Sequence, residues 1–148
     1  MPSSLRKEAP LSLQSGFFPS TDSGTVLVVS SSALVGRDLS EMLRTVGYKV
    51  DAASEAPNWN GRALIGAQLA VLCSSEPCWR VEQICEICST IRRKAPNLPV
   101  IVLGPNDVET KVRLFELGAD DYLLESFNHT ELLARIRTLI RRQKLRSS

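Results

Sequence analysis

Short apolar runs rich in β-branched residues alternate with amphipathic stretches along most of the chain. Such runs are typical of strands buried on both faces of a sheet, whereas the stretches between them repeat apolar residues at helical spacing. We expect strands at residues 25–29, 48–53, 69–73, 98–103 and 121–124. We expect helices at residues 33–46, 81–94, 108–117 and 128–143. This alternation predicts an α/β fold, a five-stranded doubly wound parallel sheet with helices on both faces.

Residues with the preferences of helix caps stand at the ends of several of these helices. Ser31 or Ser32 can cap the first helix, and Gly47 lies just past its end. Two later helices begin at capping boxes, formed by Asn106 with Glu109 and by Asn128 with Glu131. In contrast, a proline, two asparagines and a glycine interrupt any regular helix within residues 54–67.

The length of 148 residues suits one domain with tails. Apolar residues make up 43% and charged residues 23% of the chain, which allows a packed core and excludes wholesale disorder. Residues 1–24 are rich in Pro, Gly and Ser, so we expect a flexible N-terminal tail there. We expect the domain to span residues 25–143, and residues 144–148 to form a C-terminal tail or the start of a linker.

The net charge of +2 is too small for a chain that works mainly as a polycation on nucleic acid or on an acidic membrane. No apolar run approaches the length of a membrane span, and no signal peptide opens the sequence. We therefore expect a cytoplasmic protein with no membrane partner and with reduced cysteines.

The sequence LGADDYLLESF at residues 117–127, followed by ELLARIRTLIRR at residues 131–142, is similar to a response-regulator receiver domain. The resemblance extends over residues 25–143 and is to the OmpR/PhoB subfamily, transcription factors with a winged-helix output domain. It implies a flavodoxin-like, CheY-like fold, in agreement with the order of expected strands and helices. It also implies phosphoryl transfer to an aspartate at the end of the third strand, beside a magnesium ion held by an acidic pair after the first strand.

The residues that carry this chemistry in the family are all replaced here. The acidic pair falls on Ser30 and Ser31, the acceptor aspartate on Cys73, the hydroxyl residue after the fourth strand on Gly104, and the lysine after the fifth strand on Glu125. Serine hydroxyls do not replace carboxylates as ligands of Mg²⁺, and Glu125 would repel phosphate. The resemblance therefore predicts a degenerate pseudo-receiver that lacks the phosphoacceptor aspartate and acts independently of phosphorylation. We expect no metal ion and no cofactor.

In the resembling subfamily, the fourth helix, fifth strand and fifth helix form a symmetric dimer surface of ion pairs around an apolar patch. The matching positions here combine both signs of charge with apolar residues: Val108, Lys111, Phe115, Glu116, Asp120, Asp121, Glu131, Ala134, Arg135, Arg137 and Arg142. A two-fold interface can use both signs because each residue meets its complement twice, so we expect a homodimer. The alternative is that Glu131 and Arg135 pair within one helix and the other charges are a solvated surface. Tyr122 matches the aromatic switch position of the family, and without phosphate we expect it to serve in packing.

The cysteines follow the pattern C-x4-C-x6-C-x2-C, at Cys73, Cys78, Cys85 and Cys88. Clustered thiols suggest a metal or redox site. However, Cys85 and Cys88 lie on the apolar stripe of their expected helix, and Cys73 ends a buried strand, so core packing is the favoured interpretation. Cys78 stands in a loop, where we expect the most reactive of the four thiols.

Two features invite comparison with enzymes. Residues 73–80 resemble the loop of cysteine phosphatases, but six residues separate the cysteine from the arginine instead of five, and Pro77 interrupts the loop. The sole histidine, His129, stands in the first turn of an expected helix, where a surface role suffices. We expect no enzymatic activity.

Three functional hypotheses follow. The first is a phosphorylation-independent receiver that dimerises and so positions a winged-helix domain, absent from this chain, on DNA. The second is a stand-alone module that binds another regulatory protein. The third is a thiol-based redox sensor in which Cys78 and a neighbouring cysteine replace phosphate as the trigger.

Overall fold

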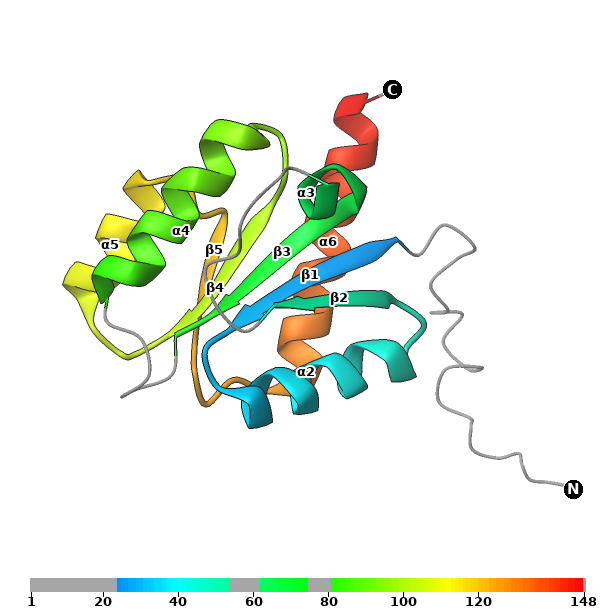
Figure 1. Ribbon diagram of the computed structural model, residues 1–148, viewed down its shortest axis with the longest axis horizontal. Coiled ribbons are helices and arrows are strands. Elements are labelled where there is room, and N and C mark those ends of the chain that lie inside the picture. Colours follow the sequence, from blue (N-terminus) through cyan, green and yellow to red (C-terminus); the bar gives the residue numbers. More distant parts are fainter. Residues whose placement is uncertain (1–23, 54–61, 75–80, 148) are drawn as a thin grey trace, which may run out of the picture.

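Five parallel strands form a single sheet in the order β2-β1-β3-β4-β5 (Figure 1). The computed structural model describes residues 24–53, 62–74 and 81–147. The strands are β1 (Thr25–Ser30), β2 (Lys49–Ala53), β3 (Ala67–Cys73), β4 (Val100–Gly104) and β5 (Asp121–Leu124). The predicted doubly wound parallel sheet is therefore confirmed, and strand order reverses between β1 and β3.

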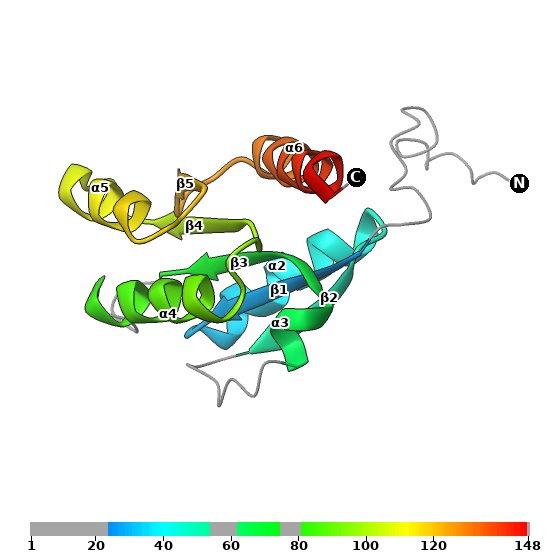
Figure 2. The ribbon, with the colours of Figure 1, turned by 90° about the horizontal axis from the view of Figure 1, so that it is seen from above.

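Helices cover both faces of the sheet. They are α2 (Ala33–Thr45), α3 (Arg62–Gly66), α4 (Val81–Lys94), α5 (Val108–Glu116) and α6 (His129–Ser147). Helices α4 and α6 lie on opposite sides of the sheet in Figure 2. The helices of the described ranges do not include one that is both long enough and apolar enough to cross a membrane.

The core consists of two apolar layers, one on each face of the sheet. Alternating side chains of one strand supply both layers: Leu27 and Val29 pack with α3, α4 and α5, whereas Val26 and Val28 pack with α2 and α6. The central strands are buried on both faces because each face is covered by helices, which explains their continuous apolar runs.

The starts of α2 and α6 agree with the predicted helix caps, whereas the start of α5 differs by one residue. Of the two candidate caps, Ser32 holds the start of α2, because its Oγ accepts a hydrogen bond from Val35 N–H at 3.3 Å. The cap of α5 is Asp107 and not the predicted Asn106. Asn128 does cap α6, since its Oδ1 accepts from the N–H groups of Thr130 and Glu131 at 2.8 and 3.1 Å.

Two helices depart further from expectation. Helix α3 occupies part of the 54–67 segment for which no regular helix was predicted; it is five residues long and begins after the last of the helix-breaking residues. Helix α6 continues to Ser147, four residues beyond the predicted end of the domain at residue 143. Residues 144–147 therefore continue the helix. The predicted tail lies, apart from residue 24, outside the described residues.

Candidate functional site at the carboxyl ends of the strands

The carboxyl ends of β1, β3, β4 and β5 bring together the residues that the resemblance aligns with the family's phosphorylation site. Ser30 is paired with Cys73 in the sheet register, and Gly104 is paired with Leu124, directly before Glu125. The Glu125 N–H donates to the Gly104 carbonyl at 2.8 Å. Four positions from distant parts of the sequence thus lie along one edge of the sheet, as the parallel arrangement requires.

The serines after β1 serve the start of α2. The buried Ser30 Oγ accepts a hydrogen bond from Ser32 N–H at 3.2 Å and lies 3.1 Å from the Ser32 carbonyl, to which it donates. Ser31 Oγ is buried and has no hydrogen-bond partner within the described part of the chain. The geometry at this strand end is therefore a serine turn leading into a helix, without a carboxylate at Ser30 or Ser31.

Cys73, which the resemblance aligns with the acceptor aspartate, is only 2% exposed at the end of β3. Burial raises the pKa of its thiol to about 12. The thiol is therefore protonated at neutral pH and packs with the apolar layer beneath α2 and α6. A buried neutral thiol is neither a nucleophile nor a metal ligand.

Gly104 and Tyr122 occupy adjoining space beside this position. The Tyr122 hydroxyl points inward and donates to the Pro105 carbonyl at 2.7 Å. A Cβ at residue 104 would lie 2.9 Å from Tyr122 Cζ and closer still to the hydroxyl oxygen. Burial, reinforced by the charges of Asp107 and Glu125, raises the Tyr122 pKa to about 12. Packing is the role predicted for Tyr122, and its burial fits that role.

Metal-binding chemistry finds no support among the residues that can be described. These residues include no group of three or more His, Cys, Asp or Glu side chains placed to hold an ion. Cys85 and Cys88 are buried on α4, as their position on its apolar stripe predicts. Burial raises the pKa of both thiols, that of Cys88 to about 11. Cys78, the predicted reactive thiol, lies outside the described residues.

A second candidate surface runs along the edge strand β5 with α5 and α6. Val108 is 71% and Phe115 41% exposed on α5. Val112, which the sequence interpretation missed, is exposed between them and extends the apolar strip. The spacing of four and three residues along one helix was the available signal.

Charged side chains beside this strip are engaged within the chain. Arg135 donates to Asp121 at 2.8 Å and to Glu131 at 3.1 Å. The second bond is the intrahelical pair of Glu131 and Arg135 that was the alternative to a dimer contact. Asp120 accepts from Arg92 Nη2 at 3.1 Å and from Val100 N–H at 2.8 Å, so it points toward α4 and β4. The remaining members of the predicted dimer surface are exposed, except for the partly buried Arg137: Lys111, Glu116, Ala134 and Arg142.

Comparison with known proteins points to one family. No protein-family model matches the chain. The chain is 36% identical over 124 residues to the transcriptional regulatory protein PcoR of Escherichia coli, covering 80% of this chain and 52% of that protein. It is 33% identical over 128 residues to the response regulator MprA of Mycobacterium ulcerans, covering 81% of this chain and 51% of that protein. The chain thus spans about half the length of the curated relatives it matches.

Solved structures agree with these relatives. A CheY-like receiver domain protein from Methanospirillum hungatei JF-1 has a TM-score of 0.71 at 23% identity, covering 83% of this chain and 98% of that one. The receiver domain of DrrB in its BeF3-activated form has a TM-score of 0.68 at 27% identity, covering 80% of this chain and 97% of that one. Strand order, core and sequence similarity together identify the described part of this chain as a response-regulator receiver domain with the CheY-like fold, of the type found in OmpR/PhoB regulators.

Proposed function

We propose that this chain is a pseudo-receiver that acts without aspartate phosphorylation, and that it dimerises to regulate transcription from the cytoplasm. The observation that carries the proposal is the set of residues at the strand ends, where Ser30, Ser31, Cys73, Gly104 and Glu125 replace the family's reactive groups.

The chemistry of these residues supports independence from phosphorylation. Mg²⁺ is bound through carboxylate and other hard oxygen ligands, and a serine pair supplies no negative charge to attract it. The thiol of Cys73 is buried and protonated, so it does not replace an aspartate as a phosphoryl acceptor. Glu125, in the place of a lysine, adds a negative charge where phosphate would need a positive one.

Dimerisation is supported by the surface formed by α5, β5 and α6. Val108, Val112 and Phe115 form an exposed apolar strip beside side chains of both charges. Exposed apolar strips rimmed by charged residues are characteristic of protein–protein contacts. A two-fold contact between copies would cover the strip on both chains at once. The output would be a winged-helix DNA-binding domain of the kind that the resemblance implies, since the match covers only about half the length of the transcriptional regulators.

Two measurements test the proposal together. Incubation with acetyl phosphate and Mg²⁺ should leave the protein mass unchanged, and an acid-labile adduct of one phosphoryl group would overturn independence from phosphorylation. Sedimentation equilibrium in reducing, magnesium-free buffer should give the mass of a dimer. A monomer would overturn the dimer and favour a module that binds another regulatory protein through the same strip.

A matched pair of variants locates the interface. Phe115→Glu should give a monomer, because it places a charge within the apolar strip. Leu34→Glu introduces the same charge at an exposed apolar residue of α2 and should leave the dimer intact. Equal effects of the two substitutions would show that the strip is not the contact.

The thiol-sensor alternative gains no support from the described cysteines. Thiolates are the reactive species, and burial raises the pKa of Cys73, Cys85 and Cys88. Slow labelling of these thiols in the folded protein is the expected result.

A further inference from the structure

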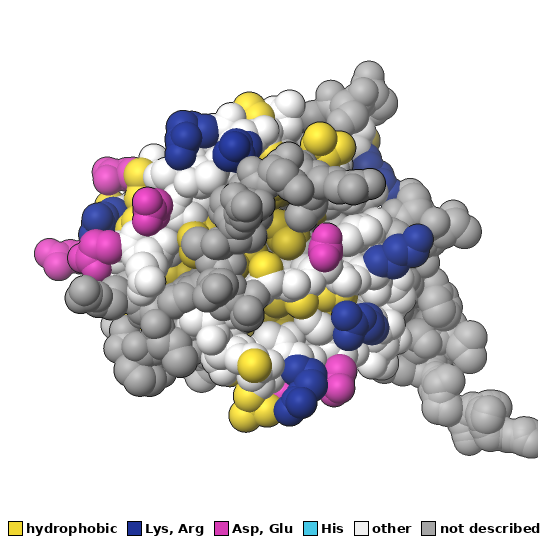
Figure 3. Space-filling view, viewed as in Figure 1, with side chains coloured by type: hydrophobic (Ala, Val, Ile, Leu, Met, Phe, Trp, Pro, Cys, Tyr) yellow, Lys and Arg dark blue, Asp and Glu magenta, His cyan; other side chains and the backbone are white. Residues whose placement is uncertain are grey.

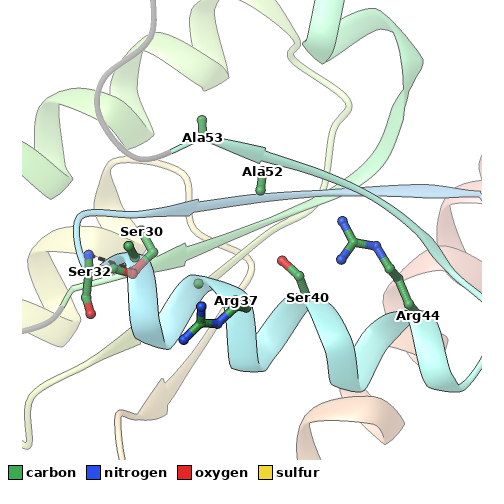
Figure 4. Close-up of a pocket in the computed structure, with 9 residues that line it drawn as sticks. Ser30, Ser32, Arg37, Ser40, Arg44, Ala52 and Ala53 are labelled. Atoms are coloured by element: carbon green, nitrogen blue, oxygen red, sulfur yellow. Dashed lines mark hydrogen bonds between the residues drawn. The ribbon is translucent and has the colours of Figure 1, made fainter.

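A groove of about 330 Å³ lies between α2 and the β1–β2 edge of the sheet (Figure 4). Small residues create it. Ala33, Gly36 and Ser40 follow one face of α2, spaced three and four residues apart. Ala52 lines the groove from β2, on the same face of the strand as Val50, which packs against the α2 layer.

The polar groups of the groove are cationic or neutral. Arg37 and Arg44 line it, and no acidic side chain does. Neither arginine forms an ion pair with any residue that the structure describes. In Figure 3, basic and acidic side chains lie over α2, beside a strip of apolar side chains between α2 and β2. The groove therefore offers positive charge that the described fold does not neutralise.

Ser40 supplies the second, independent observation. Its side chain is buried, with the residue only 3% exposed, and its Oγ has no hydrogen-bond partner in the described residues. The hydroxyl lies on the side of α2 that faces the strands, as does the Arg44 guanidinium (Figure 4). Buried hydroxyls are nearly always hydrogen-bonded to protein or ordered water, so this one can bond with a molecule that enters the groove.

We propose that this groove binds a small phosphorylated organic anion, with its phosphate held by Arg44 and Ser40. A phosphate accepts hydrogen bonds from a guanidinium and a hydroxyl together, because it presents several oxygens. The volume exceeds that of inorganic phosphate and reaches the range of small-molecule sites, so an organic body fits along Ala33 and Gly36. Arg37 lies about 10 Å from Arg44 along the helix axis, within reach of a second polar group of the ligand.

The test is a titration of the ¹⁵N-labelled protein with inorganic phosphate and with glycerol 3-phosphate, at ionic strength matched with chloride. Amide shifts should cluster at Ser32, Gly36, Ser40 and Ala52. Glycerol 3-phosphate should bind more tightly than inorganic phosphate, because it also fills the groove. Equal affinities for the two probes would overturn the inference that the groove binds an organic phosphate. Amide shifts spread over basic residues on every face of the protein would show a general ionic effect and would overturn the proposal of a site in this groove.

Variants with matched controls complete the test. Arg44→Gln and Ser40→Ala should each weaken binding of glycerol 3-phosphate, the arginine change by about tenfold or more. Ser40→Ala should not lower stability, since it removes an unpaired buried hydroxyl. Ala52→Leu should block binding by filling the groove while every charge stays in place.

Arg93→Gln removes the same charge from an exposed position on α4, across the sheet from the groove, and should leave binding unchanged. The same loss in Arg93→Gln as in Arg44→Gln, or wild-type affinity in Ser40→Ala, would overturn the proposal.

Discussion

Tyr122 fills the space that a side chain at residue 104 would occupy, so its inward orientation depends on glycine at that position. The two residues stand on neighbouring strands, eighteen positions apart in the sequence. The hydrogen bond from the Tyr122 hydroxyl to the Pro105 carbonyl fixes the ring in place. The Tyr122 ring on β5 can therefore take its inward position because residue 104 on β4 has no side chain.

Gly104→Ala should displace the Tyr122 ring and lower its pKa from about 12 toward the ordinary value near 10. The added Cβ overlaps the hydroxyl, and an outward ring loses the burial that raises its pKa. Spectrophotometric titration in a Tyr48→Phe background isolates Tyr122, because the chain has two tyrosines. Gly66→Ala is the control, since a Cβ there meets nothing within 4 Å. An unchanged Tyr122 pKa in Gly104→Ala would show that the ring is not held by glycine.

The buried thiol of Cys73 should make the protein less stable as pH rises above 9. In the unfolded chain the thiol ionises near 9, whereas in the folded chain its pKa is about 12. The unfolded state therefore binds fewer protons between these values, and the free energy of unfolding falls with pH. Relative to Cys73→Ser, the wild type should lose about 1 kcal/mol per pH unit above pH 9 in urea denaturation. Parallel pH profiles for the two proteins would contradict this linkage.

Asp120→Ala should destabilise the domain by about 1–3 kcal/mol, because it leaves the buried Val100 N–H without its side-chain acceptor. Arg92 would lose its carboxylate partner at the same time. Asp120→Asn should cost less, since the amide oxygen still accepts a hydrogen bond. Asp38→Ala, on the exposed side of α2, removes the same charge and should change stability by no more than about 0.5 kcal/mol. Urea denaturation of the three variants checks this order of free energies of unfolding, with Asp120→Ala the least stable and Asp38→Ala the most stable.

Arg135→Glu should abolish the dimer and lower monomer stability by about 1 kcal/mol, because the new carboxylate would face Asp121 and Glu131. Sedimentation equilibrium reports the mass, and denaturation of the resulting monomer reports the stability. Arg141→Glu reverses an exposed charge on the same helix outside the proposed contact and should remain dimeric. A dimer that persists in Arg135→Glu would remove this arginine from the interface.

The strand pattern could be predicted from sequence because the central strands are buried on both faces. Nothing polar interrupts Val26–Val29 or Val100–Leu103, so their apolar runs stand out. Helix α4 was also predictable, since its buried residues repeat at helical spacing. The one-turn helix α3 was not, because five residues are too few to establish a period. The α5 cap was misassigned to Asn106 because both Asn106 and Asp107 are residue types that favour the cap position; the Asp107 carboxylate accepts from the Thr110 hydroxyl and makes no side-chain cap bond to a backbone N–H.

The strand-end residues were predictable from the resemblance, but their contacts were not. The fit of Tyr122 against Gly104 depends on the register of β4 with β5, which no local pattern encodes. The groove beside α2 is defined by small side chains on α2 and β2, and small residues carry little periodic signal. The missing hydrogen bond of Ser40 likewise becomes visible only once the helix is packed against the sheet.

Helix α6 extends beyond the core that anchors it. Within residues 129–145, the last buried side chains are those of Leu139 and Ile140, and the helix continues to Ser147 with Arg141, Arg142 and Lys144 exposed. The part of α6 that follows Ile140 is about 10 Å long. Deleting a single residue after Ile140 would shorten the helix by about 1.5 Å and rotate its last turn by about 100° about the helix axis. A one-residue change in the length of α6 therefore changes the rotation of its last turn about the helix axis far more than it changes the distance of that turn from the core.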